Sequence, residues 1–346
     1  MGDFMKGKVN WKALINIIFI ILAMGIMIYL CISENGLTDL VNNISDFDKG
    51  WLLMSVICYL LNIVIDIILI YLFTKARYNE YKFRYAIKCS MVGQFFSAVT
   101  PGASGGQPMQ VISYSKQGID PGTGTAALIQ KFLVYQSTLV CYSIFALVFC
   151  QDAINGPIKG LAFFGFFSQA IVIVLLILFS FNKKLTKSII SFVFNLLGKI
   201  KILKNVDNKI ESLEDQLECF HNSNKELFKD KNLVLKAYAL TAAQLTTMFI
   251  VPYCIYKSFK LSGASIVDMI GTQAFVTMVS CFMPLPGASG AAEGSFYIMF
   301  GGSFGDESIK SAMLLWRLIT YYLVILISAP FSRITKNKNK KISNED

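Results

Sequence analysis

The sequence has little of the material from which soluble active sites are usually built. It contains one histidine in 346 residues, His221, and only 16% of its residues are charged, against about 25% in soluble domains. It has no Walker A motif, no Rossmann fingerprint and no zinc motif, and a single histidine excludes most catalytic triads. These absences argue against a soluble enzyme and against a pump driven by ATP. We expect His221, which lies in a polar segment, to be a surface residue.

Cysteine is present, but in no arrangement that indicates a chemical role. No two cysteines form a Cys-x-x-Cys pair, and seven of the eight lie in or beside apolar runs, where a thiol behaves as a small hydrophobic group. We therefore expect no disulfide framework, no metal site and no cofactor. The cysteines are Cys31, Cys58, Cys89, Cys141, Cys150, Cys219, Cys254 and Cys281.

Apolar residues are abundant. They make up 54% of the chain, and the mean hydropathy is +0.54. We therefore expect an all-α polytopic membrane protein, with residues 1–346 forming a single integral membrane domain. The net charge is +10, but the lysines and arginines gather between the apolar segments. That distribution follows the positive-inside rule and suits anionic lipid head groups, so we expect membrane phospholipid and not nucleic acid as a partner.

About six apolar runs are long enough to cross a bilayer, which takes about 20 helical residues. The first follows several lysines and precedes an acidic loop, and the last runs into the basic tail 333–346. Both ends of the chain are therefore expected in the cytoplasm, and the protein in the cell membrane. The expected spans are 13–32, 51–73, 123–150, 160–181, 233–256 and 308–331.

The longest polar stretch, 182–232, carries many lysines and is expected to be a cytoplasmic helical insertion. Apolar residues recur in it at spacings of four and three, which is the pattern of an amphipathic helix. That helix would lie on the membrane surface or against the helix bundle, and the segment 185–197 would form a second interfacial helix. The recurring apolar residues are Val206, Ile210, Leu213, Leu217 and Phe220.

A Pro-Gly-Ala-Ser-Gly sequence occurs twice, and each copy interrupts an apolar run, at 86–115 and at 266–303. Proline and glycine break helices, and broken backbone at membrane depth is tolerated only inside protein or beside a wet cavity. The flanking charges place both ends of the first region in the cytoplasm and both ends of the second outside. We therefore expect two re-entrant helix pairs in an inverted repeat, or eight spans if both pairs cross fully, although two glycine-rich turns can also be alike by chance. The residues of the breaks are Pro101, Gly102, Gly105, Gly106, Pro286, Gly287, Gly290 and Gly294.

Four ionisable residues fall within the apolar runs, where each costs about 2.5–3.5 kcal/mol unless it has a partner or a wet cavity. Glu293 follows the second break and Arg317 lies in the next span, so we expect these two to form an ion pair. Asp66 and Lys131, in the second and third spans, form a second candidate pair. Such pairs can serve a translocation path or can only fix helix packing, and the sequence leaves both roles open.

The breaks also offer polar groups without full charge. Ser104 and Ser289 add hydroxyls to the two copies, and Gln107 and Gln110 follow the first copy. Glycine lets the backbone approach a ligand closely, and a helix that restarts after a break points free N–H groups at anions. A phosphate head group fits this chemistry, so we include these four residues among the candidate substrate contacts.

These motifs resemble the lysylphosphatidylglycerol synthetase transmembrane region, the flippase-like membrane domain at the N-terminus of bifunctional MprF proteins. The resemblance covers residues 10–332 and rests on TPGASGG at 100–106, PLPGASGAAEG at 284–294 and the arginine in LLWRLITYY at 314–322. Asp66 stands where that family commonly has an acidic residue in its second span. The resemblance implies a flippase-like fold and a role in lipid metabolism linked to resistance to cationic antimicrobial peptides.

The sequence departs from the family pattern in two respects. Relatives commonly continue the first motif as Gly-Glu-x-x-Arg, whereas here the two charged positions are Gln107 and Gln110. In bifunctional relatives a C-terminal cytosolic domain transfers lysine from lysyl-tRNA to phosphatidylglycerol, and the membrane domain moves the product outward. We expect that lysyltransferase domain to be absent from this chain, so the sequence leaves open whether the protein is an enzyme.

Three functions therefore stay open. The first is a membrane lipid translocase that moves an anionic or lysyl-modified phospholipid, or a related lipid-linked anion, between leaflets. The second is phosphatidylglycerol lysyltransferase activity, or a subunit of it, with a partner enzyme of lipid synthesis supplying the transferase. The third is a scaffold that transports nothing. Each is compatible with a homo-oligomer.

Overall fold

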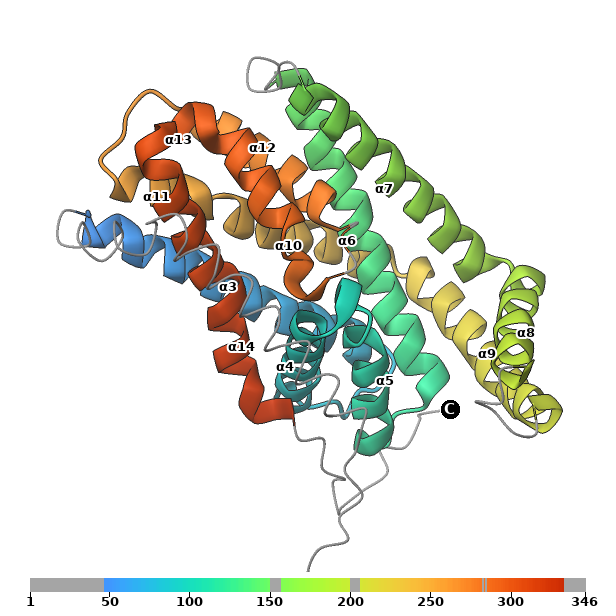
Figure 1. The fold of residues 1–346 in the computed structure, drawn as a ribbon. Coiled ribbons are helices and arrows are strands. Elements are labelled where there is room, and N and C mark those ends of the chain that lie inside the picture. Colours follow the sequence, from blue (N-terminus) through green and yellow to red (C-terminus); the bar gives the residue numbers. More distant parts are fainter. Residues whose placement is uncertain (1–46, 150–156, 200–205, 282, 284, 333–346) are drawn as a thin grey trace, which may run out of the picture.

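Every regular element that the structure describes is a helix (Figure 1). The computed structural model describes residues 47–149, 157–199, 206–281, 283 and 285–332. The all-α expectation is confirmed over these ranges. The first expected span, 13–32, and the basic tail, 333–346, lie outside the described residues.

Four stretches of the described chain are long and apolar enough to cross a membrane. The first, α3 (Lys49–Lys75), starts where the Asp48 side chain accepts a hydrogen bond of 2.8 Å from the N–H of Gly50, and its 27 residues measure about 40 Å. Three of the stretches match expected spans, and the fourth, Pro286–Ser332, contains the second break. The matching helices are α3, α6 (Pro121–Phe149) and α10 (Lys231–Phe249) with its continuation α11 (Val251–Ser258).

A fifth candidate span is bent. The apolar helix α7 (Pro157–Phe181) is followed by α8 (Lys183–Lys199), and the two meet at an angle of 104°. Asn182 stands at the bend, where its side-chain oxygen accepts a hydrogen bond of 3.0 Å from the N–H of Leu185 and so caps α8. The expected span at 160–181 therefore ends at the expected place, and the insertion begins with its own helix.

The insertion's longer helix, α9 (Val206–Lys229), packs against the helix bundle. Phe220 is buried against Ala126 and Ile129 of α6, and Gln130 of α6 donates a hydrogen bond of 2.8 Å to the backbone oxygen of Asn224. Figure 1 shows α8 and α9 side by side at one end of α6 and α7. Of the two placements left open by the sequence, the structure shows the one against the bundle.

His221 does not lie at the surface, and that expectation was wrong. Its residue is only 7% exposed, and its Nδ1 lies 3.1 Å from the backbone oxygen of Ser180 at the end of α7. The reason is that α9 packs polar as well as apolar side chains against α7. Asn224 also donates a hydrogen bond to the Ser180 oxygen, at 3.0 Å.

Both Pro-Gly-Ala-Ser-Gly copies interrupt a helix with the same local backbone. In each copy Pro-Gly-Ala forms a single 3-10 turn, η1 (Pro101–Ala103) or η3 (Pro286–Ala288). The glycine and alanine have φ of 57° and 55° in η1 and of 62° and 54° in η3, so the likeness extends beyond sequence. The flanking helices are α4 (Phe83–Val99) and α5 (Gly106–Gln117) in the first copy, and α12 (Ile266–Ser280) and α13 (Ala291–Arg317) in the second.

Helix α13 folds back on itself at Gly305, which has φ of 72° and ψ of 165°. The ring of Phe296 stacks on that of Trp316 with centroids 4.8 Å apart, although these residues would be about 30 Å apart in a straight helix. The part before Gly305 is thus the outgoing arm of the second break. The part after it continues through the π-helix η4 (Leu318–Tyr322) and α14 (Leu323–Ser328), which together cover most of the expected span at 308–331.

The two breaks lie against each other, with Pro286 of the second copy buried and residues 101–104 of the first copy exposed. Turns η1 and η3 are in contact, and η3 also contacts α4. The hydroxyl of Tyr321 donates a hydrogen bond of 3.0 Å to the backbone oxygen of Ala98, near the end of α4. Two segments almost 190 residues apart therefore meet at their broken backbones (Figure 1).

Candidate functional site

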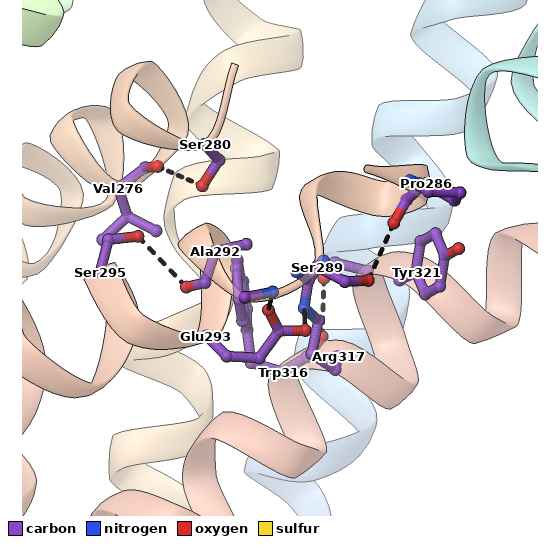
Figure 2. Close-up of polar contacts among 12 residues, drawn as sticks. Val276, Ser280, Pro286, Ser289, Ala292, Glu293, Ser295, Trp316, Arg317 and Tyr321 are labelled. Carbon is purple, nitrogen blue, oxygen red and sulfur yellow. Dashed lines mark hydrogen bonds and ion pairs between the residues drawn. The ribbon is translucent and has the colours of Figure 1, made fainter. Parts of the chain in front are cut away.

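Glu293 and Arg317 form a buried ion pair beside the second break (Figure 2). Arg317 Nε lies 2.7 Å from Glu293 Oε1, and the two side chains are 6% and 8% exposed. They meet because Gly305, which reverses the chain, lies midway between them in the sequence. The other carboxylate oxygen, Oε2, accepts a hydrogen bond of 2.7 Å from the N–H of Gly290. Glu293 thus joins the N-terminus of α13 to the guanidinium group.

The two copies diverge after Pro-Gly-Ala, and this divergence makes the contact possible. Gly105 continues in a helical conformation, with φ of −81° and ψ of −20°. Gly290 instead has φ of 90° and ψ of −55°, a conformation open to glycine but costly for other residues. The two serines expected to contact the substrate form the same hydrogen bond in both copies. Ser104 and Ser289 each donate to the backbone oxygen of the proline three residues earlier, at 2.8 Å.

Aromatic rings surround the guanidinium of Arg317. Its central carbon lies 5.0 Å from the ring centroid of Trp316 and 5.5 Å from that of Tyr321, distances at which a cation is attracted to a ring face. Arg317 Nη2 and the indole nitrogen of Trp316 are both buried and have no hydrogen-bond partner, and the ion-paired atoms Arg317 Nε and Glu293 Oε1 do not meet in hydrogen-bond geometry. The site therefore keeps donors that its own residues do not use.

Tyr321 is a site residue that the sequence reasoning missed. Besides its bond to Ala98 and its position over Arg317, its ring fills the space where a side chain on Gly287 would lie, since a Cβ there would be 2.3 Å from the ring. It links the first break to the second and to the arginine. The available signal was its position four residues after Arg317, which places both side chains on one helix face.

Asp66 and Lys131 also form the expected ion pair, from α3 to α6. The hydroxyl of Ser90, on α4, donates a hydrogen bond of 2.5 Å to Asp66 Oδ2, and Gln244 Nε2, on α10, lies 3.5 Å from Oδ1. Four helices therefore converge on one carboxylate. Ser90 was not among the residues expected here.

Tyr59 connects α3, the helix that carries Asp66, to the segment that follows Arg317. Its hydroxyl donates a hydrogen bond of 2.7 Å to the backbone oxygen of Thr320, inside the π-helix that follows Arg317. A π-helical turn inside an α-helix often marks a functional site.

The two glutamines expected near the first break have different surroundings. Gln110 is buried, donates a hydrogen bond of 3.3 Å to the backbone oxygen of Cys89, and lies directly against Gly93. It therefore holds α4 to α5. Gln107 is exposed and is free to meet a partner outside the chain.

The cations of the two ion pairs lie at nearly the same distance from the two breaks. Lys131 lies 29 residues after Gly102, and Arg317 lies 30 residues after Gly287. Each also follows a positive-φ glycine that ends the arm after the break, Gly118 in the first half and Gly305 in the second. The acid that pairs with Arg317 lies between the second break and Arg317 itself. The acid that pairs with Lys131 instead comes from α3, before the first break.

This arrangement suits the binding of an anion. Within the described ranges, no three His, Cys, Asp or Glu side chains lie close enough together to hold a metal ion. A guanidinium and a helix N-terminus are the two groups that proteins most often direct at phosphate. Both are present beside the second break, at Arg317 and Gly290.

Comparison with known proteins agrees with this architecture. The family model described as "Lysylphosphatidylglycerol synthase TM region" matches residues 14–328. The chain belongs to this family. The lysylphosphatidylglycerol synthase TM region match includes both breaks and both ion pairs. A UPF0104 membrane protein of Archaeoglobus fulgidus is 22% identical over 274 residues, which cover 76% of this chain and 80% of that protein. The chain is thus a multi-pass membrane protein of the lysylphosphatidylglycerol synthase TM region family.

Proposed function

We propose that the protein moves a phospholipid with an anionic or lysyl-modified head group, or a related lipid-linked anion, between the two leaflets of the cell membrane. The observation that carries the proposal is the contact between the two broken helices beside the buried Arg317. Broken backbone at membrane depth needs protein or water around it. Two such breaks in one place are the arrangement in which transporters bind their substrates.

The membrane topology that goes with this function has six spans and two re-entrant helix pairs. The pairs α4–α5 and α12–α13 would enter from opposite faces, as an inverted repeat with both chain termini in the cytoplasm. The shared backbone of η1 and η3 and the matching positions of Lys131 and Arg317 support a repeat. The site would then lie near the midplane, within reach of both leaflets.

Within the site, Arg317 would bind the phosphate of the head group. Its free Nη2 donor and its aromatic neighbours suit a planar, bidentate contact with phosphate oxygens. The Asp66–Lys131 pair would provide a second charged binding position for the head group. Movement would be passive or coupled to an ion gradient.

The test is leaflet exchange in proteoliposomes that contain head-group-labelled phosphatidylglycerol or lysyl-phosphatidylglycerol and receive a quencher from outside only. We expect the wild-type protein to expose inner-leaflet lipid much faster than protein-free liposomes. The variant that tests the site is Glu293→Gln/Arg317→Gln, which removes both charges together and leaves no buried ion unpaired. We expect it to fold and to lose exchange.

Two other outcomes would point elsewhere. If the folded wild-type protein moves neither lipid above background, the translocase proposal fails for these substrates. Transfer of label from lysyl-tRNA to lipid in the same vesicles would then favour a transferase. If the double variant exchanges lipid at the wild-type rate, the pair only fixes helix packing, and the site lies elsewhere.

A further inference from the structure

The carboxylate of Glu293 is bonded as a phosphate would be. One oxygen lies 2.7 Å from Arg317 Nε, and the other accepts the N–H of Gly290 at 2.7 Å. These are a guanidinium and the N-terminus of the part of α13 that precedes the fold-back at Gly305, the donors that phosphate groups use in proteins. Glu293 is thus an anion of this chain that fills an anion site.

The carboxylate leaves buried donors of the site without a hydrogen bond. Arg317 is only 5% exposed, yet its Nη2 has no hydrogen-bond partner, and the nearby indole nitrogen of Trp316 has none either. A buried donor without a partner destabilises the folded protein. A phosphate has more oxygens than a carboxylate, so it can satisfy donors that Glu293 leaves over.

There is also room for a ligand to approach. Gly290, at the N-terminus of α13, is exposed, and a Cβ added to it or to Gly294 would meet no other atom within 4 Å. The two glycines are four residues apart and therefore lie on one side of the helix start. Glu293 is adjacent to Gly294 in the sequence, and its side chain and that of Arg317 are both buried.

We propose that Glu293 is a tethered competitor that occupies the phosphate position at Arg317 and Gly290 until the phosphate of a head group displaces it. This inference deepens the proposed function, on which its choice of a lipid phosphate rests. It differs from a role in which Glu293 helps to bind the substrate. A competitor lowers affinity for the incoming anion, whereas a ligand contact raises it.

The variant Glu293→Gln separates the two roles. Glutamine keeps an oxygen for the N–H of Gly290 but removes the negative charge from Arg317. Because an apparent dissociation constant is divided by the fraction of open sites, we expect the variant to bind phosphate-bearing probes about tenfold more tightly than the wild type. The competitor inference fails if the variant binds them equally or more weakly.

Trp316 supplies the readout, because its ring lies against the guanidinium of Arg317. In full-length protein in detergent, with Trp11→Phe and Trp51→Phe in every variant, its fluorescence is titrated with dihexanoyl phosphatidylglycerol, with inorganic phosphate, and with neutral dihexanoylglycerol. Glu226→Gln, which removes an acid from an exposed ion pair with Arg77, controls for net charge and should leave both dissociation constants unchanged. Glu293→Gln/Arg317→Gln should abolish binding while keeping a cooperative thermal transition.

The two phosphate probes distinguish failure of this inference from failure of the proposed function. Tighter binding of both phosphate probes by Glu293→Gln supports Glu293 as a competitor and a lipid phosphate as the anion that displaces it. Tightening toward inorganic phosphate alone supports the competitor but contradicts lipid as the substrate. If neither probe binds more tightly to Glu293→Gln, the competitor is overturned, and leaflet exchange by the wild-type protein still decides the proposed function.

Discussion

Single buried charges are the most demanding residues of this chain, because each costs about 2.5–3.5 kcal/mol in an apolar environment. The structure meets that cost in two ways. Glu293 and Arg317 offset each other's charge across one fold-back of the chain, with Gly290 donating a backbone N–H to Glu293. Asp66 instead gathers Lys131 and Ser90 from two other helices. The second arrangement holds separate helices together, so its loss should affect the whole bundle.

We therefore predict a strong double-mutant effect at Asp66 and Lys131. Asp66→Asn leaves the lysine as an unpaired buried charge and should destabilise the protein by about 3–5 kcal/mol. Asp66→Asn/Lys131→Gln removes both charges and should recover most of that loss, because an unpaired charge costs more than an absent pair. The measurement is the thermal unfolding of the three proteins in detergent. Equal loss in the single and double variants would show that the two charges do not interact energetically.

Gly287 and Gly294 provide a second residue-level prediction. Gly287 has φ of 62°, and a Cβ there would be 2.3 Å from the Tyr321 ring, whereas Gly294 is helical with open space around it. Gly287→Ala combines left-handed backbone with overpacking and should cost about 2–4 kcal/mol. Gly294→Ala should instead stabilise α13 by about 0.5–1 kcal/mol. Unfolding midpoints of the two variants check this, and similar midpoints would mean that Tyr321 does not hold the turn.

At the scale of elements, the sequence predicts what local chemistry decides. Apolar length predicts α3, α6 and α10, and a proline-glycine pair predicts each break. Long-range contacts decide the rest. The fold-back at Gly305 depends on Phe296 meeting Trp316, and nothing nearby in the sequence distinguishes this glycine from Gly301 or Gly302. The ion pairs could be predicted because buried opposite charges must find each other, but the link through Tyr321 could not.

The burial of His221, on α9, is another long-range contact that the sequence did not predict. It makes the stability of this part of the fold depend on pH. Burial lowers the pKa of His221 from 6.5, and the neighbouring charge of Lys183 adds to that shift. The unfolded chain therefore takes up a proton at a higher pH than the folded chain. Stability from this residue is complete above pH 6.5 and decreases as the pH falls through the folded pKa.

We expect α9 to loosen from the bundle as the pH falls below 6.5. Hydrogen exchange of the α9 amides, compared between pH 7.5 and pH 5.5 and corrected for the intrinsic rate, measures this directly. His221→Gln keeps a hydrogen-bonding side chain that does not titrate, so its α9 protection should change less over the same range. A change as large in His221→Gln as in the wild type would assign the effect to another group.

For the whole molecule, the open question is how the two halves relate across the membrane. The order of elements repeats: a helix, a Pro-Gly-Ala turn, a second arm, a positive-φ glycine and a long helix with a buried cation. In an inverted repeat, α4 and α12 enter from opposite faces and their turns meet, as η1 and η3 do. In a parallel repeat the arms would start on the same face. The exposed residues Arg84 and Ile266 mark these starts.

We predict that the starts of α4 and α12 are labelled from opposite sides of the membrane. In a variant without its eight native cysteines, Arg84→Cys should react with an impermeant maleimide only in inside-out vesicles, and Ile266→Cys only in right-side-out vesicles. Lys184→Cys, in the insertion that we place in the cytoplasm, should react like Arg84→Cys. Labelling of Arg84→Cys and Ile266→Cys from one side would exclude the inverted repeat. The helix pairs α4–α5 and α12–α13 would then enter the membrane from the same face. Their contact would no longer support a site that is reached from both leaflets.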